Sequence, residues 1–239
     1  MARKPQRSAK AAPKRAPALP PPSGSDREKI IAAFMALLAE KRFEQIGFGD
    51  ISARAGVSLA TARAEFGSTL SILAAHMKEL DRKVLAGGEG DMAEEPPRER
   101  LFDVLMRRVE AMAPHREAVR SLMKSAQCNP GLAFALNGLA VRSQTWMLTA
   151  AGIGTTGPRG ALRAQGAALM FGRVLGVWVD DETPELDRTM VALDRGLASA
   201  ERWSGFMDDL FCIPALLCRG LPRGRRARNF DRGVEADAA

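Results

Sequence analysis

The chain has 239 residues and a formal net charge of +7, and 46% of its residues are hydrophobic, with no tyrosine. That length suits one large domain or two small ones, and the abundance of Ala, Leu and Met favours helices over sheets. No run of about 18 uncharged apolar residues occurs, and the basic N-terminus lacks an apolar core, which argues against a transmembrane helix and a secretory signal. The scattered Cys128, Cys212 and Cys218 indicate free thiols in a reducing cytoplasm.

The positive charge is concentrated at the two ends of the chain. Residues 1–25 hold six basic residues and no acid, and residues 216–239 hold six arginines against three acids. Subtracting these charges of +6 and +3 from +7 leaves residues 26–215 with −2. The net charge therefore does not by itself indicate a DNA-binding face, because basic tails attract nucleic acid and anionic lipid alike.

The N-terminal third begins with a segment that cannot fold alone. Residues 1–24 are basic and rich in Pro and Ala, so we expect a disordered arm. Ser25 and Glu28 form a capping-box pattern, and Ile30, Phe34 and Leu37 then recur at helical spacing. The sequence predicts helices at 26–41, 49–55, 59–65 and from Ser68 to about residue 85.

A break at 86–97, rich in Gly, acids and Pro, is the best domain boundary. It separates a unit at 25–86 from a second helical unit at 98–207, and 208–239 follows as a flexible basic tail. No strand signal is present, so the fold class is all-α with about nine helices. Further helices are expected from Arg98 to Pro114 and at 115–125, 132–151, 161–180 and 184–206.

The short segments 49–55 and 59–65 meet at Ala55-Gly56-Val57-Ser58, which has the features of a helix-turn-helix. Gly56 can adopt the left-handed conformation of a tight turn, and Ser58 can cap the second helix. The N-terminal part of such a second helix enters a major groove of DNA. A plain corner in a helical bundle is the alternative interpretation, because glycine turns between helices are common.

The surrounding pattern resembles the TetR family of transcriptional regulators over residues 26–85. The matching residues are Asp50-Ile51, Ala55-Gly56-Val57-Ser58, Thr61, Phe66, Gly67 and Ser68. The resemblance implies an all-α homodimer in which a small N-terminal three-helix DNA-binding domain is joined to a larger helical effector and dimerisation domain. We therefore expect contacts with a double-stranded DNA operator from Ser58, Leu59, Thr61, Arg63, Ser68 and Thr69.

The sequence departs from the family where phosphates are usually bound. Leu59 follows the capping serine, Arg63 stands where an aromatic is usual, and Thr69 replaces a common Lys. Residues 26–85 hold nine basic and eight acidic residues, a net +1 that is small for a domain that neutralises several phosphates.

Residues 98–203 are similar to a second group, the lipid-binding accessory protein of ubiquinone biosynthesis. The stretches "RERLFDVLMRRVEAMAPHREAVRSL" and "VLGVWVDDETPELDRTMVALDRGLASAERW" carry this resemblance. It implies a lipid- or quinone-binding protein of TetR-like fold that acts at a membrane, as the alternative to a regulator. The apolar and then basic segment 206–226 is a candidate contact with the membrane surface, or else a tail packed on the bundle.

The larger unit offers apolar residues for a hydrophobic ligand or lipid, although an ordinary core explains each of them as well. The helices 161–180 and 184–206, with Leu169, Trp178 and Leu193 among their apolar residues, are the expected dimer seam. No metal-ligand spacing, phosphate loop or nucleophile–base pair is evident, so we expect no enzyme activity and no cofactor or metal. The candidate pocket residues are Met106, Met123, Phe134, Arg142, Trp146, Met170 and Phe171.

Overall fold

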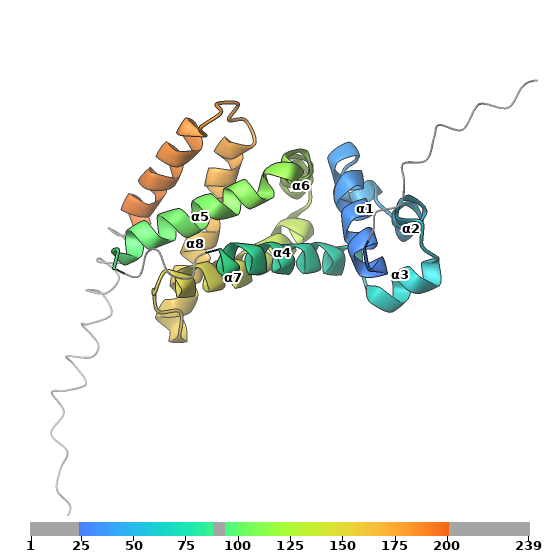
Figure 1. Ribbon diagram of the computed structural model, residues 1–239, viewed down its shortest axis with the longest axis horizontal. Coiled ribbons are helices and arrows are strands. Elements are labelled where there is room, and N and C mark those ends of the chain that lie inside the picture. The colour runs from blue at the N-terminus through green and yellow to red at the C-terminus, as the bar shows by residue number, and fades with distance from the viewer. Residues whose placement is uncertain (1–23, 88–93, 201–239) are drawn as a thin grey trace, which may run out of the picture.

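The computed structural model describes residues 24–87 and 94–200, which fold into helices joined by short connections (Figure 1). Residues 187–200 form one more helical stretch, so the described part of the chain contains nine α-helical segments, as the sequence predicts. None of the described helices is long and apolar enough to span a bilayer. The elements are α1 (Asp26–Glu40), η1 (Phe43–Gln45), α2 (Phe48–Ala55), α3 (Leu59–Glu65), α4 (Thr69–Ala86), α5 (Pro97–Met112), η2 (Ala113–His115), α6 (Arg116–Cys128), α7 (Pro130–Ala150) and α8 (Gly157–Trp178).

A small core holds α1, α2 and α3 together at one end of the molecule (Figure 1). Helix α1 begins with the predicted capping box: the Ser25 hydroxyl accepts from the Glu28 amide, and the Glu28 carboxylate accepts from the Ser25 amide. Its buried face, which includes Ile30 and Phe34, meets Ile51 of α2 and Ala62 of α3. These small helices are stable because they share one continuous apolar contact.

Helix α4 belongs to both cores of the molecule. Ile72 and Leu73 in its first half pack into the small core, whereas Leu80 and Val84 in its second half pack into a larger core. Figure 1 shows α4 running lengthwise from the small end toward α5 and α8. The change from one core to the other therefore occurs within α4, ahead of the Gly- and Pro-rich break in the sequence at 86–97.

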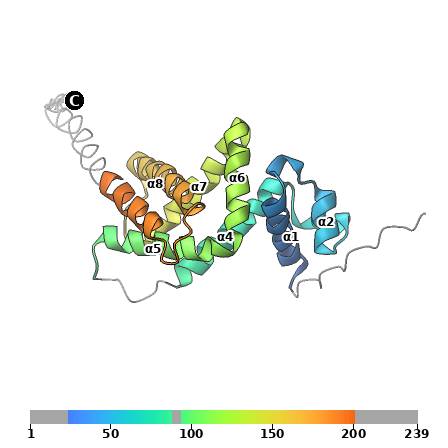
Figure 2. The ribbon, with the colours of Figure 1, turned by 90° about the horizontal axis from the view of Figure 1, so that it is seen from above.

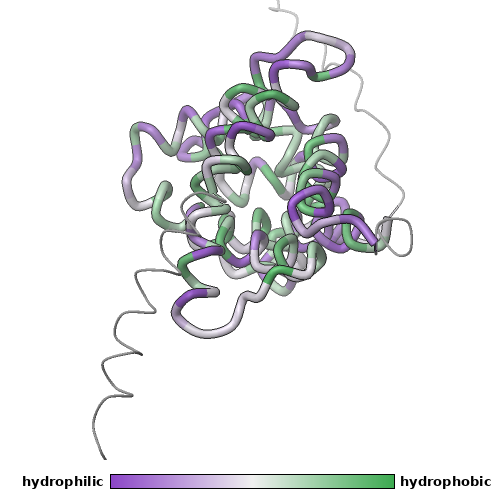
Figure 3. Tube along the Cα trace, turned by 90° about the vertical axis from the view of Figure 1, so that its left-hand side faces the viewer, coloured by the Kyte–Doolittle hydropathy of each residue, from purple (hydrophilic) through white to green (hydrophobic). Residues whose placement is uncertain are grey.

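The larger core lies among α5, α7, α8 and residues 187–200 (Figure 2). Trp178, Leu105 and Leu193 are among its completely buried side chains. Hydrophobic and hydrophilic residues alternate along most helices (Figure 3), as expected for amphipathic helices that cover a shared interior.

A buried ion pair stands inside the larger unit. Arg108 of α5 donates to the Asp81 carboxylate of α4, and the Ser143 hydroxyl of α7 donates to the same oxygen at 2.8 Å. The Arg108 guanidinium also lies over the Phe171 ring, 5.8 Å from its centroid. Because a buried charge is tolerated only with such partners, this cluster fixes the register of three helices against one another.

The corner after α8 differs from the sequence prediction of a helix that begins at Pro184. The helix begins at 187 instead, and Leu186 has a φ of 56°. The cause is the buried Asp181 carboxylate, which accepts hydrogen bonds from the amides and hydroxyls of both Thr183 and Thr189. These bonds fold 181–186 into a compact turn, and Thr183 then accepts from the Asp187 amide at the helix start.

Candidate nucleic-acid interface

The turn between α2 and α3 has the geometry that the sequence predicts. Gly56 ends α2 with φ 69° and ψ 30°, in the left-handed region that glycine enters without strain. Ser58 then caps α3: its hydroxyl accepts from the Thr61 amide at 3.0 Å and lies 2.8 Å from the Thr61 hydroxyl. The Ser58 cap and the buried Phe66 that follows the helix hold a seven-residue segment that would be too short to persist alone.

Helix α3 separates its residues cleanly into an inner and an outer face. Ala62 is completely buried and Phe66, just after the helix, is nearly so. On the other face Arg63 is exposed and Leu59 retains 59% of its surface. Thr61 lies between the faces, half-buried beside Ser58. The outer face is therefore a short exposed ridge of Leu59, Ala60, Arg63 and Ala64.

The start of α4 lies next to this ridge in the chain. The Ser68 hydroxyl caps α4 by accepting from the Ser71 amide at 3.1 Å, and the Ser71 hydroxyl accepts from the Ser68 amide at 3.1 Å. Thr69 is the first residue of the helix and is half-buried. Of the six predicted DNA-contact residues, Ser58, Leu59, Arg63 and Ser68 are exposed, and Thr61 and Thr69 are half-buried.

Four of the six basic side chains between residues 27 and 63 are paired with acids. Arg27 of α1 lies 3.5 Å from Glu65 of α3 and 4.6 Å from the centroid of the Phe66 ring, which ties the start of α1 to the end of α3. Arg54 donates two hydrogen bonds, of 2.9 and 2.7 Å, to Glu40. Lys41 and Asp50 lie 3.6 Å apart. Within the described residues Arg63 has no ion-pair partner, so its charge is available to a ligand.

Three solved structures show the same architecture, with low sequence identity. A TetR regulator from Nitrosomonas europaea superposes with a TM-score of 0.57 at 22% identity, covering 73% of this chain and 97% of its own. A second, from Rhodococcus sp. RHA1, gives 0.53 at 21% identity over 73% and 95% of the two chains. One from Streptomyces coelicolor gives 0.50 at 15% identity over 83% and 93%. The fold is the TetR-regulator fold. No protein-family model matches the sequence, and no curated protein matches it significantly.

The solved structures and the exposure of α3 bear on the two alternatives to a helix-turn-helix regulator. Among the described residues nothing covers the outer face of α3, which lies at the end of the molecule (Figure 1). The alternative expectation, a lipid-binding accessory protein, gains no support from these three structures. The tail at 206–226 on which it partly depended lies outside the described residues.

The structure brings only some of the candidate pocket residues together. Met106, Met123 and Met170 are half-buried against the larger core, and Phe171 lies within it. Phe134 and Trp146 on α7 are 81% and 56% exposed, and Arg142 between them is also exposed. The inner four residues therefore border one interior, whereas the three on α7 face outward.

Several residues that organise the site give no local sequence signal. Arg27 and Glu65 are far apart in the chain, and so are Asp81, Arg108 and Ser143. Each has an ordinary surface pattern in the sequence, because a charged residue on an amphipathic helix usually faces water. Only the packing of the helices against one another shows which charged side chains face inward.

Proposed function

We propose that this chain is a DNA-binding transcriptional regulator of TetR type, whose operator affinity responds to a hydrophobic ligand in the larger unit. The observation that carries the proposal is the uncovered face of α3, with Leu59 and Arg63 exposed on a helix fixed at both ends. Exposed leucine contacts thymine methyl groups and arginine contacts guanine or phosphate, so this pair suits a major groove.

The distribution of charge near α3 determines how DNA binding would depend on salt concentration. Because Arg42 and Arg63 are the basic residues of 24–67 that are in no ion pair, the six basic residues of segment 1–25 would supply much of the phosphate neutralisation. Affinity should therefore fall steeply with salt, and sequence preference should depend on α3. A ligand bordered by Met106, Met123, Met170 and Phe171 would act on α4, which enters both cores.

Operator binding is tested by gel shift with the DNA that flanks the protein's own gene, over a series of salt concentrations. We expect a sequence preference that survives at about 150 mM salt and that falls by roughly 10- to 100-fold in Arg63→Ala. Arg82→Ala on the second half of α4 is the matched control, because Arg82 is also exposed but lies beyond the small core. Equal affinity of both variants for operator and random DNA would refute the proposal.

A further inference from the structure

Helix α6 connects the small unit to the larger one through polar contacts. On one side the Ser121 hydroxyl donates to the Lys41 carbonyl at 2.8 Å, and the Phe43 amide donates to the Ser125 hydroxyl at 3.1 Å. Ala118 of α6 is buried in the small core as well. The loop that ends α1 is therefore fastened directly to α6.

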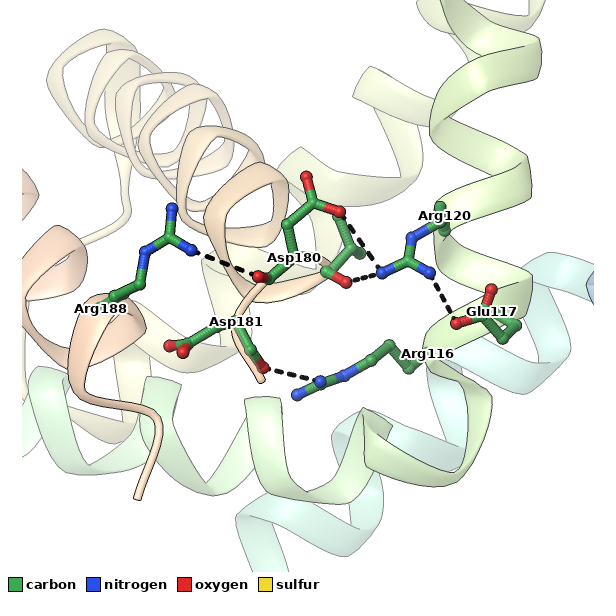
Figure 4. A network of polar contacts seen from close by, with 7 residues as sticks. Arg116, Glu117, Arg120, Asp180, Asp181 and Arg188 are labelled. Carbon is green, nitrogen blue, oxygen red and sulfur yellow. Dashed lines mark hydrogen bonds and ion pairs between the residues drawn. The ribbon is translucent and has the colours of Figure 1, made fainter. Parts of the chain in front are cut away.

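The other side of α6 holds the corner that follows α8 (Figure 4). Arg116 donates to the Asp181 carbonyl at 2.8 Å, and Arg120 donates to the Val179 carbonyl. These guanidinium groups satisfy carbonyls that the end of α8 leaves free and oppose its negative dipole. One helix thus contacts both the α1–η1 loop and the end of α8.

A cavity of about 250 Å³, open to solvent, lies where α6 meets the end of α1. Its walls come from the end of α1, from the loop and η1, and from α6, and no lining residue belongs to α2 or α3. It is therefore separate from the proposed DNA-reading surface. The lining residues are Ala39, Glu40, Lys41, Arg42, Gln45, Glu117, Arg120, Ser121 and Lys124.

The cavity is positively charged once its acids are accounted for. Its four basic and two acidic residues give a net +2. The hydrogen bonds from Arg54 lower the pKa of Glu40 and keep it ionised, so its negative charge is offset by that of Arg54, and Glu117 accepts from Arg120 at 2.8 Å. Among the described residues Arg42 and Lys124 have no ion-pair partner, and they line the cavity from the loop and from α6 respectively.

We propose that this cavity binds a small soluble anion carrying phosphate or carboxylate groups, held between Arg42 of the loop and Lys124 of α6. The planar guanidinium of Arg42 can donate two parallel hydrogen bonds to one such group. Lys124 supplies a compact second charge across the cavity. Gln45 uses its carbonyl oxygen to accept from the Arg42 amide at 3.3 Å, which leaves its amide group as a further donor.

An anion here would regulate the chain by strengthening the existing contact of α6 with the loop, a consequence that rests on the proposed function. Arg120 both lines the cavity and holds the Val179 carbonyl, so an occupied cavity is in contact with the corner after α8. The bound anion would therefore bias how the small unit is placed on the larger one.

The test titrates the full-length protein with pyrophosphate and with citrate by calorimetry at constant ionic strength, and maps amide shifts by NMR. We expect saturable binding of one anion per chain, with shifts in 41–45 and 120–124. Lys124→Gln and Arg42→Gln should each weaken binding by about tenfold or more. Lys78→Gln, which removes an exposed charge outside the cavity, should leave binding unchanged.

Three results would overturn the proposal. The first is the absence of saturable binding, and the second is an equal loss in Lys78→Gln and Lys124→Gln, which would indicate diffuse attraction. The third is binding only to phosphatidylglycerol vesicles and not to pyrophosphate, which would make a lipid headgroup the ligand. Because the titration contains no DNA, its failure leaves operator binding untouched, and a failed gel shift leaves the anion site untouched.

Discussion

Gly56 sets the angle of α3 through its backbone conformation and not through contacts of its own. A Cβ built on Gly56 would meet nothing within 4 Å, so no clash forbids a side chain there. The constraint is the φ of 69°, which any L-residue adopts only at a free-energy cost. At this position the free space around the backbone would permit a side chain, whereas the backbone conformation disfavours one.

Gly56→Ala should therefore lower the free energy of unfolding by about 1 kcal/mol, measured by urea denaturation. Gly138→Ala is the matched control: Gly138 is exposed in the middle of α7, also has open space around its Cβ, and has no positive φ. There alanine should stabilise by about 1 kcal/mol, because it is the better helix former. Equal and same-signed effects of the two substitutions would contradict the conformational argument.

At the scale of the element, helix α4 meets η2 through two histidines. The His76 and His115 rings lie 4.7 Å apart between centroids and are nearly perpendicular. Burial lowers the pKa of both, and for His76 the neighbouring charges of His115, Lys83 and Arg108 act in the same direction, bringing its pKa to about 4. The folded protein therefore holds both rings neutral at neutral pH.

The pH dependence of stability follows from that shift. The pKa of His76 is about 6.5 in the unfolded chain and about 4 in the folded chain. The unfolded chain therefore binds more protons between these two pH values, so this contribution to the free energy of unfolding is fully present above pH 6.5 and is lost as the pH falls toward 4. We expect wild type to lose about 2 kcal/mol through His76 between pH 7.5 and 5. His76→Gln should lose correspondingly less in urea denaturation at the two pH values. Parallel losses in both proteins would show that the pair does not titrate in this way.

The elements also show which parts of the fold the sequence could predict. Helix α3 was predicted at 59–65 and is found at Leu59–Glu65, because the signals that bound it, Gly56 and Ser58, are local. The helix expected from Pro184 starts at 187, because the buried Asp181 organises that corner through residues up to eight positions away. Helix caps can be predicted from neighbouring residues in the sequence. A buried carboxylate cannot be told from a surface one until its hydrogen-bond partners are known.

At the scale of the whole molecule, the same limit applies to the expected dimer seam. Trp178 and Leu193, which the sequence predicts to lie in the dimer seam, are completely buried inside the subunit. The outer face of α8 is different: Leu162 and Leu169 are 48% and 54% exposed and lie seven residues apart, which places them on one side of the helix. Val191 on the neighbouring stretch 187–200 is 47% exposed as well.

This outer face is suited to a second copy of the chain. Gly166, between Leu162 and Leu169, and Gly172, one turn beyond Leu169, are exposed on α8 with nothing within 4 Å of a built Cβ, so a partner helix can approach closely there. The opposite face of α8 is already filled by Phe171, Val174 and Trp178. A two-sided apolar helix at the edge of a subunit would leave its outer side in water unless a partner covered it.

Leu169→Glu should therefore convert a homodimer to monomers, as measured by sedimentation equilibrium, because it places a charge in the apolar seam. Leu59→Glu is the matched control, since Leu59 is 59% exposed but stands on α3. The control should remain dimeric yet lose operator binding, whereas Leu169→Glu should lose operator binding only through loss of the paired half-site. If Leu169→Glu stays dimeric with unchanged affinity between subunits, the seam lies on another face, of which the α7 surface bearing Phe134 and Trp146 is the next candidate.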